Sequence, residues 1–266
     1  MFWPSSGLAA ASTRVYSPRM SIDSLSDLKG LRRAGLVVAS TLEMLRSHVR
    51  PGITTAELDA IALEHLRRHG ARSAPQLAYN FPGATCISVN EEAVHGVPGP
   101  RVLQDGDLVT LDVTVELDGY YADAAVTVPV GTPTQLGVAL CACAEAAFWK
   151  GAMAARAGEG LARIGYEVEQ EVRRHGFRVL RELCGHGIGR TIHEGPNVCN
   201  FYDPRNRTRL TKGLVIALEP IISAGSDRTR TERDGWTVRS ADRSLTAHFE
   251  HTIVISSGSP LVLTAA

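Results

Sequence analysis

The sequence predicts an α+β fold in which a pair of helices followed by a mostly antiparallel sheet occurs twice along the chain. Three observations predict it. The expected elements run in the order helix, helix, strands, and then repeat that order. The expected second helix of each half ends in Arg-Arg-His-Gly, at residues 67–70 and 173–176. A two-residue turn signal at Asp118-Gly119 joins two strand-like runs as an antiparallel hairpin. Together they indicate an internal duplication, with chance similarity at a helix end as the alternative.

The first half begins with an amphipathic helix over Ser26–His48, which ends before Pro51-Gly52. A capping box, Thr54 to Glu57, starts the second helix, which stops at His69-Gly70. Strand-like runs follow at residues 86–89, 108–116 and 120–130.

In the second half, Pro133 and Thr134 open a helix that runs to about residue 157, and another spans roughly 161–175. Strand candidates lie near residues 177–180, 214–219, 237–238 and 249–255. Two helices would then lie on one face of the sheet in each half, and a site is expected where the halves meet.

Composition excludes several classes of function. The chain has 266 residues, 44% of them hydrophobic, which is enough for a large core in one big domain or two small ones. Its net charge of zero argues against a nucleic-acid surface. No apolar stretch approaches the ~18–20 residues of a membrane span. Five cysteines, odd in number and without a CxxC spacing, fit a reducing compartment, so we expect a cytoplasmic protein.

The first 22 residues contain no acid, are rich in Ser, Ala and Pro, and have no apolar run of the signal-peptide kind. We expect residues 1–20 to form a flexible extension and residues 21–266 to form a single domain. Met20 is an alternative start, because the helical pattern begins just after it.

The hairpin places two acids together. With Asp118-Gly119 as the loop, Thr114 faces Asp123 and Asp112 faces Ala125. Asp112 and Asp123 then share one face as diagonal neighbours ~7–8 Å apart, a separation from which two carboxylates can bracket metals. The alternative is an exposed hairpin face with both acids in water.

The glycine-rich segment at 185–193 contributes two histidines, His186 and His193. Its alternating glycines allow a close backbone approach and argue against a helix, so the two imidazoles need not stack. One could bind a metal while the other faces the substrate.

Two further acids interrupt apolar runs. Glu219 ends the run 214–218, and Glu250 precedes His251-Thr-Ile-Val-Ile. A buried acid is costly unless it is paired, and a salt bridge to an Arg is the alternative for each. Four carboxylates and one imidazole instead predict about two divalent cations that activate water, as in a metallohydrolase. A mononuclear zinc site would leave two carboxylates unexplained, since such sites usually take four ligands including water.

Several motifs, in order and spacing, resemble the type I methionine aminopeptidases over about residues 21–255. They are DLVTLDVTV with DGYYAD, GHGIG with IHEGP, ALEP, and DGWT with DRSLTAHFEHTIVI. The resemblance implies the pita-bread fold, a pseudo-two-fold duplication, with residues 21–266 as its catalytic domain. It implies that Asp123 and Glu250 bridge two metals, that Asp112 completes one metal site, and that His186 and Glu219 complete the other.

The same resemblance implies the remaining roles. Glu219 would shuttle a proton, His95 would contact the scissile amide, and His193 would contact the substrate carbonyl. A pocket for the methionine side chain would be lined by Tyr79, Phe81, Cys86 and Trp236, with ordinary core packing as the alternative for each. The ligand set tolerates Co, Mn, Fe, Ni or Zn. A monovalent cation would lie near Asn90 and Thr246.

The implied activity is removal of the N-terminal methionine from nascent proteins whose second residue is small. We expect a monomer, with the ribosome as a candidate partner. Val94, Ile192 and a shorter stretch at 76–82 depart from the family pattern and bear on the shape of the pocket. Two alternatives stay open: a proline-directed aminopeptidase or dipeptidase of the same fold, and a non-catalytic binding protein on this scaffold. The first usually carries an additional N-terminal domain, and the second typically loses metal ligands.

Overall fold

The computed structural model describes residues 22–265, so the extension predicted at residues 1–20 lies outside the described residues. Five helices are described: α1 (Leu25–His48), α2 (Thr55–Arg68), α3 (Ala74–Tyr79), α4 (Gln135–Ala154) and α5 (Leu161–Arg174). The strands of the first half are β1 (Arg72–Ser73), β2 (Cys86–Val89), β3 (Glu92–Val94), β4 (Leu108–Leu117) and β5 (Tyr120–Pro129). Those of the second half are β6 (Arg178–Val179), β7 (Cys184–Gly187), β8 (Glu194–Cys199), β9 (Val215–Leu218), β10 (Ile221–Ser223), β11 (Thr229–Thr231), β12 (Val238–Ser240), β13 (Thr246–Val254) and β14 (Leu261–Val262).

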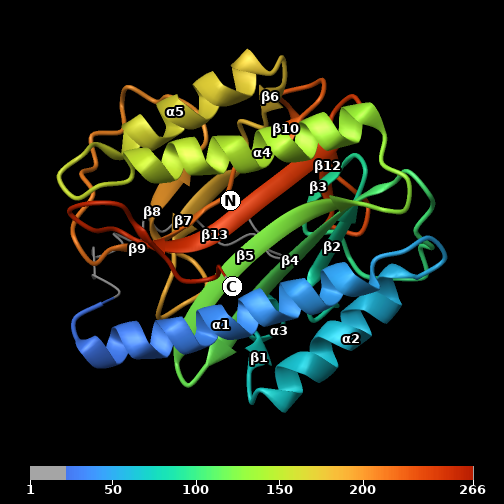
Figure 1. Cartoon of the computed structure of the whole chain (residues 1–266), viewed down its shortest axis with the longest axis horizontal. Coiled ribbons are helices and arrows are strands. Elements are labelled where there is room, and N and C mark those ends of the chain that lie inside the picture. Colours follow the sequence, from blue (N-terminus) through green and yellow to red (C-terminus); the bar gives the residue numbers. More distant parts are fainter. Residues whose placement is uncertain (1–21, 266) are drawn as a thin grey trace.

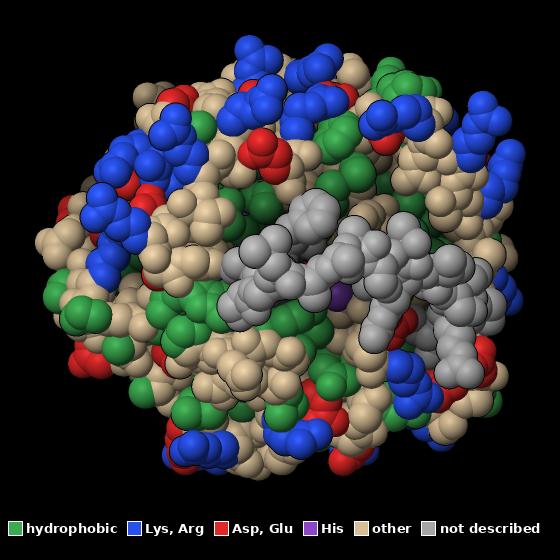
Figure 2. Space-filling view, turned by 180° about the vertical axis from the view of Figure 1, so that it is seen from behind, with side chains coloured by type: hydrophobic (Ala, Val, Ile, Leu, Met, Phe, Trp, Pro, Cys, Tyr) green, Lys and Arg blue, Asp and Glu red, His purple; other side chains and the backbone are tan. Residues whose placement is uncertain are grey.

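The strands form one large antiparallel sheet whose central path is β1-β4-β5-β13-β9-β7-β8, and a small sheet of β11, β12 and β3. Figure 1 shows α1 over β4 and β5 with α2 beside it next to β1 and β2, and α4 and α5 above them over the second half. The predicted α+β fold, with two helices from each half on one face of the sheet, is confirmed. Figure 2 shows the opposite face, where hydrophobic side chains gather toward the middle and Lys and Arg side chains lie around the rim.

Strand alternation decides which face meets the helices. Val109, Leu111, Val113 and Val115 of β4 are fully buried in a cluster with apolar residues of α1 and α2. A second cluster joins α4 and α5 to β9 and β13 and includes the fully buried Phe148. The alternate residues of β4, Asp112 among them, therefore point to the face away from the helices.

The hairpin register predicted from the sequence is confirmed. Thr114 pairs with Asp123 and Asp112 pairs with Ala125 across β4 and β5. Asp118 and Gly119 both have positive φ, 52° and 81°, as the favoured two-residue turn requires. The face with Asp112 and Asp123 is not the wet one, because Thr110, Thr114 and Asp123 are buried.

Several elements were not predicted. Helix α3 begins with Ser73 as its N-cap and has Pro75 in its first turn, but six residues are too few for a helical period. The segment expected as a glycine-rich turn contains strand β7, so His186 lies in a strand. Gly185 is required there because a Cβ would lie 2.3 Å from the carbonyl oxygen of Ala217 on β9.

Helix α4 differs from the expectation that no apolar stretch would be as long as a membrane span. Among residues 22–265 it is the one helix long and apolar enough to cross a membrane by length and composition, although no apolar run of that length was expected. Leu140, Ala144 and Phe148 are buried against α5 and the sheet, as in the core helix of a globular fold.

Candidate metal centre

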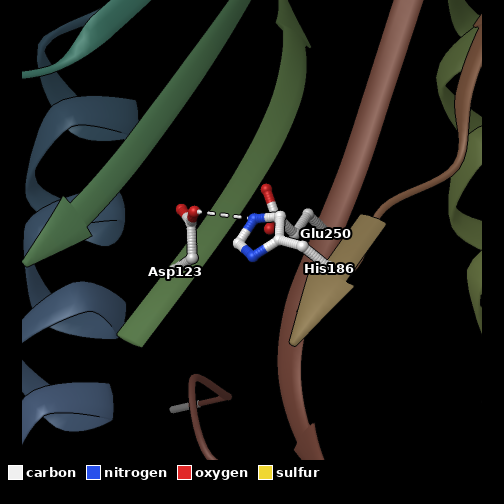
Figure 3. A group of neighbouring side chains, drawn as sticks. All are labelled: Asp123, His186 and Glu250. Atoms are coloured by element: carbon white, nitrogen blue, oxygen red, sulfur yellow. Dashed lines mark ion pairs between the residues drawn. The ribbon is translucent and has the colours of Figure 1, made fainter. Parts of the chain in front are cut away.

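The five predicted ligands converge on the face of the sheet away from the helices. Glu250 on β13 pairs with Ala125 on β5, which on its other side pairs with Asp112 on β4. The small Ala125 side chain therefore lies between two acids, and Asp123 lies two residues along β5 on the same face. Figure 3 shows Asp123, His186 and Glu250 pointing toward one another from β5, β7 and β13.

Histidine and carboxylate atoms alternate through this cluster. Nε2 of His186 lies 3.8 Å from Oδ2 of Asp123 and 3.6 Å from Oε1 of Glu219. On the far side of Glu219, Nε2 of His248 lies 3.9 Å from Oε2 of Glu219 and 3.3 Å from Oε2 of Glu250. The two imidazoles therefore flank the two oxygens of a single carboxylate.

Burial shifts the pKa of every member. Glu219 and Glu250 are 1% and 2% exposed, and burial together with the neighbouring acids raises the pKa of both well above its usual value. Burial also raises the pKa of Asp123 to about 7 and lowers that of His186 to about 4. A neutral imidazole is the form that binds a metal. In the described part of the chain, the ion pairs of Glu219 and Glu250 are with histidines and not with an Arg.

Unpaired oxygens test whether a metal fits. Within residues 22–265, Oδ1 of Asp123, both carboxylate oxygens of Glu219 and Oε1 of Glu250 are buried without a hydrogen-bond partner. Leaving buried carboxylate oxygens unpaired is costly, and divalent cations would satisfy them. The donor set therefore fits divalent metals.

Among the described residues, two groups of three side chains could each hold a metal, because the ligand atoms within each group lie within 4.8 Å of one another. One group is Asp123, His186 and Glu250, and the other is Glu219, His248 and Glu250. Glu250 belongs to both, as a bridging residue would. Asp112 belongs to neither and instead shares a hydrogen bond with Asp123.

Two other predicted histidines line the same cavity. His95 directly follows β3, is 4% exposed and has a positive φ of 57°. Such a backbone is uncommon outside glycine and clusters at functional sites. Burial lowers the pKa of His95 to about 4 and that of His193 to about 2. As expected, the imidazoles of His186 and His193 are not stacked; their rings meet edge to face, with centroids 4.2 Å apart.

Of the four residues predicted to line the methionine pocket, one lines the cavity and three lie outside its lining. Cys86 lines the cavity directly. Tyr79 contacts it through His193, while Phe81 and Trp236 pack edge to face at 5.3 Å. Sequence reasoning missed some residues that line the cavity, namely Pro75, Thr114 and His248. The signal for His248 was its place two residues before Glu250, on the same face of the strand.

Comparison with known proteins agrees with this fold and identifies its family. The model of metallopeptidase family M24 matches residues 29–257. The chain is similar to methionine aminopeptidase 2 of Bacillus subtilis, with 43% identity over 92% of this chain and 99% of the relative. A solved methionine aminopeptidase from Rickettsia prowazekii superposes with a TM-score of 0.89 at 35% identity, covering 92% of this chain and all of the other. The chain belongs to the metallopeptidase family M24.

A more distant structure separates fold from activity. The prolidase from Pyrococcus furiosus matches with a TM-score of 0.76 at 19% identity, and the match covers 93% of this chain but only 66% of the prolidase. That likeness shows the fold alone. The pita-bread fold implied by the sequence motifs is thus confirmed.

Proposed function

We propose that this protein is a methionine aminopeptidase that removes the N-terminal methionine from nascent proteins and peptides with a small second residue. One observation carries the proposal: four acids and a histidine that match the family motifs line one cavity, and the three acids that are buried there, Asp123, Glu219 and Glu250, have unpaired oxygens. The relatives that match nearly the whole chain carry this activity in their names.

Asp112, Asp123, His186, Glu219 and Glu250 would hold two divalent cations. Asp123 and Glu250 would contact both, and the inclusion of Glu250 in both ligand groups supports its part in this. Such a pair of cations, when bound, lowers the pKa of water so that hydroxide is available near neutral pH. Mixed oxygen and nitrogen ligands suit Co, Mn, Fe, Ni or Zn.

The other side chains would handle the peptide. A carboxylate oxygen of Glu219 would accept the proton of the attacking water and pass it to the leaving amine. His95 would contact the scissile amide. His193 would donate from Nε2 to the carbonyl oxygen, which gains charge in the transition state. This role is supported by the Tyr79 hydroxyl 2.5 Å from Nδ1 of His193, which can hold the proton of His193 on Nε2.

The methionine side chain would lie against Cys86, with Tyr79, Phe81 and Trp236 nearby. A flexible thioether packs well against aromatic rings, and the edge-to-face pair of Phe81 and Trp236 supports that use. A proline-directed activity is less well supported, since the proline-directed relative is much longer and only 19% identical.

Several finer points belong to the same proposal. Residues 21–266 would act as one catalytic domain of a cytoplasmic monomer that meets nascent chains, with the ribosome as a partner. A monovalent cation would lie near Asn90 and Thr246. The main-chain oxygens of Asn90 and Glu92 support that site, because both lie within 2.9 Å of the Thr246 hydroxyl.

The test is methionine release from a Met-Ala-Ser peptide by metal-free protein, with Co, Mn, Fe and Zn added back singly. A Met-Lys peptide and an X-Pro peptide are the controls. Metal-dependent release from Met-Ala-Ser alone would support the proposal. Cleavage of the X-Pro peptide instead would favour the proline-directed alternative, and no release by folded protein would favour a non-catalytic scaffold.

A further inference from the structure

His248 occupies a position in the cluster to which the resemblance gives no role. It lies on β13 and pairs in register with Ile221 on β10, two residues after Glu219. Its backbone is fixed on the other side, because its N–H donates to Oγ1 of Thr127 at 2.7 Å and its carbonyl accepts from the same hydroxyl at 3.1 Å. The imidazole is therefore held between Glu219 and Glu250.

The ring of His248 is buried, and its nitrogens make no hydrogen bond to the described residues. The residue is 2% exposed, and neither Nδ1 nor Nε2 has a hydrogen-bond partner in the described part of the chain. Buried polar groups are normally paired, so an imidazole with two unpaired nitrogens in a polar cavity indicates a missing partner. That cavity is the one lined by the predicted metal ligands.

The distances identify that partner as a cation. Nε2 of His248 lies 3.3 Å from Oε2 of Glu250 and 3.9 Å from Oε2 of Glu219, with no hydrogen bond to either. Ligand atoms ~2.0–2.2 Å from one metal, at the angles of a tetrahedral or octahedral site, lie about 3.0–3.5 Å from one another. The spacing is thus close to that of two oxygens and a nitrogen around one ion.

We propose that Nε2 of His248 is an additional ligand for the divalent cation held by Glu219 and Glu250. The inference rests on the proposed dinuclear function and extends its ligand set by one nitrogen. An imidazole in place of a water favours Co, Ni and Zn over Mn, because the first three bind nitrogen more strongly. His248 is thereby a determinant of metal preference.

The test compares His248→Gln with a matched control, His251→Gln. His251 lies three residues further along the same strand on the opposite face, where Nδ1 is 2.8 Å from Oγ1 of Thr264 and the ring packs on Phe148. Each metal-free protein is titrated with Co and with Mn by calorimetry, and the visible absorption of the Co complexes is recorded.

We expect His248→Gln to weaken Co binding by about 10-fold or more, to weaken Mn binding less, and to change the Co spectrum. His251→Gln should leave affinities and spectrum as in the parent protein. An unchanged Co spectrum in His248→Gln would overturn the proposal, as would an equal loss of affinity in both variants. Failure of the parent protein to release methionine while it binds Co through His248 would count against the proposed function alone.

A second observation, independent of the metal centre, concerns two cysteines on the hairpin that carries His186. Cys184 on β7 and Cys199 on β8 are partners in register, and their sulfur atoms lie 3.1 Å apart. Directly opposed residues of antiparallel strands have Cα atoms about 4.5–5.5 Å apart, within the range that a disulfide spans. Both side chains are partly exposed, so an oxidant can reach them.

We also propose that Cys184 and Cys199 form a disulfide when a peroxide oxidises the protein. One thiolate displaces hydroxide from hydrogen peroxide to give a sulfenic acid, and the second thiol displaces water from it to form the sulfur–sulfur bond. The two thiols are oxidised by two electrons, and the peroxide is reduced to two waters. The bond would fix β7 to β8 at the open end of the hairpin.

Peroxide treatment followed by mass spectrometry of the intact chain and its peptides tests this. We expect a loss of about 2 Da, a peptide linking Cys184 to Cys199, reversal by dithiothreitol, and no such link in Cys199→Ser. Cys141→Ser is the matched control and should still form the link. A link between other cysteines, or oxidation of Cys199 without a link, would overturn the proposal.

Discussion

The hydroxyl of Tyr79 lies 2.5 Å from Nδ1 of His193, and this contact joins α3 to the loop between β7 and β8. The centroids of the Tyr79 and His193 rings are 5.6 Å apart. Because burial keeps His193 neutral, with its pKa lowered to about 2, one ring nitrogen carries the proton and the other does not. A hydroxyl that donates to Nδ1 selects the tautomer with the proton on Nε2, so Tyr79 positions the donor proposed for the substrate carbonyl.

Tyr79→Phe should therefore lower kcat/KM for a Met-Ala-Ser peptide by about 3- to 10-fold, the size of one lost hydrogen bond. The fall should appear mainly in kcat, since the hydrogen bond to the carbonyl oxygen strengthens in the transition state. Steady-state kinetics at saturating metal measures it, with metal content checked in parallel. A change confined to KM would indicate that Tyr79 only lines the pocket.

The β4–β5 turn offers a test of the fold. Gly119 has a φ of 81° and open space around its missing Cβ, so an added methyl costs backbone strain rather than a clash. Gly119→Ala should lower the free energy of unfolding by about 1–2 kcal/mol in urea denaturation.

The control for that variant is Gly258→Ala, in an exposed loop without such a φ, where the added Cβ meets only Oγ of Ser256 at 4.0 Å. It should change stability by less than about 0.5 kcal/mol. Equal effects of the two substitutions would contradict the assignment of strain to the turn.

Much of the fold could be predicted because local rules and the tertiary structure agree. The capping box at Thr54 and Glu57 starts α2, and the Asp118-Gly119 turn sets the register that places Asp112 and Asp123 on one face. Some of the short elements could not be predicted, although candidates near residues 177–180 and 237–238 do correspond to β6 and β12. Strands β10 and β14 are three and two residues long and exist because β13 offers them a partner, which local sequence does not show.

The residues of the candidate site could likewise be predicted only in part. Glu219 and Glu250 could be identified because they lie in apolar runs, where burying an acid costs free energy unless a partner such as a metal is present. The sequence gave no comparable indication for His248, since a histidine on a strand is common. Its significance depends on the packing of β10 beside β13, which brings Glu219 to its ring.

Asp123 is expected to be indispensable for metal binding. Asp123→Asn should weaken binding of Co by at least about 100-fold and remove methionine release, because the amide lacks the charge that offsets loss of metal hydration. Asp118→Asn is the matched control, since this acid is exposed on the same hairpin and its ion pair within residues 22–265 is with Arg33 at 2.9 Å. Calorimetric titration of both metal-free variants distinguishes the two, and full Co affinity in Asp123→Asn would remove Asp123 from the ligand set.

The metal-free protein should lose stability as pH rises above about 6.5. The raised pKa values of Asp123, Glu219 and Glu250 mean that the native state keeps protons which the unfolded chain has released above about pH 4. The stabilising effect of those protons is complete below about pH 4 and disappears as pH rises through the native pKa, about 7 for Asp123. Buried histidines such as His186, whose pKa is lowered to about 4, act in the opposite sense, but their effect is complete above about pH 6.5.

Above that pH each extra native proton on the acids lowers stability by about 1.4 kcal/mol per pH unit. Cys199 opposes this by at most one proton, because its hydrogen bond with Cys184 lowers its pKa to about 7. Urea unfolding between pH 6.5 and 8.5 should show stability of the metal-free protein falling with pH. Glu219→Gln should have a shallower slope, because its amide cannot release a proton. Saturating metal should abolish the fall, because bound acids are already ionised and the ion offsets their charge. A metal-free parent whose stability is flat or rises over this range would mean that Asp123, Glu219 and Glu250 are not all protonated in the native state, and that their charge is neutralised in some way other than by bound protons.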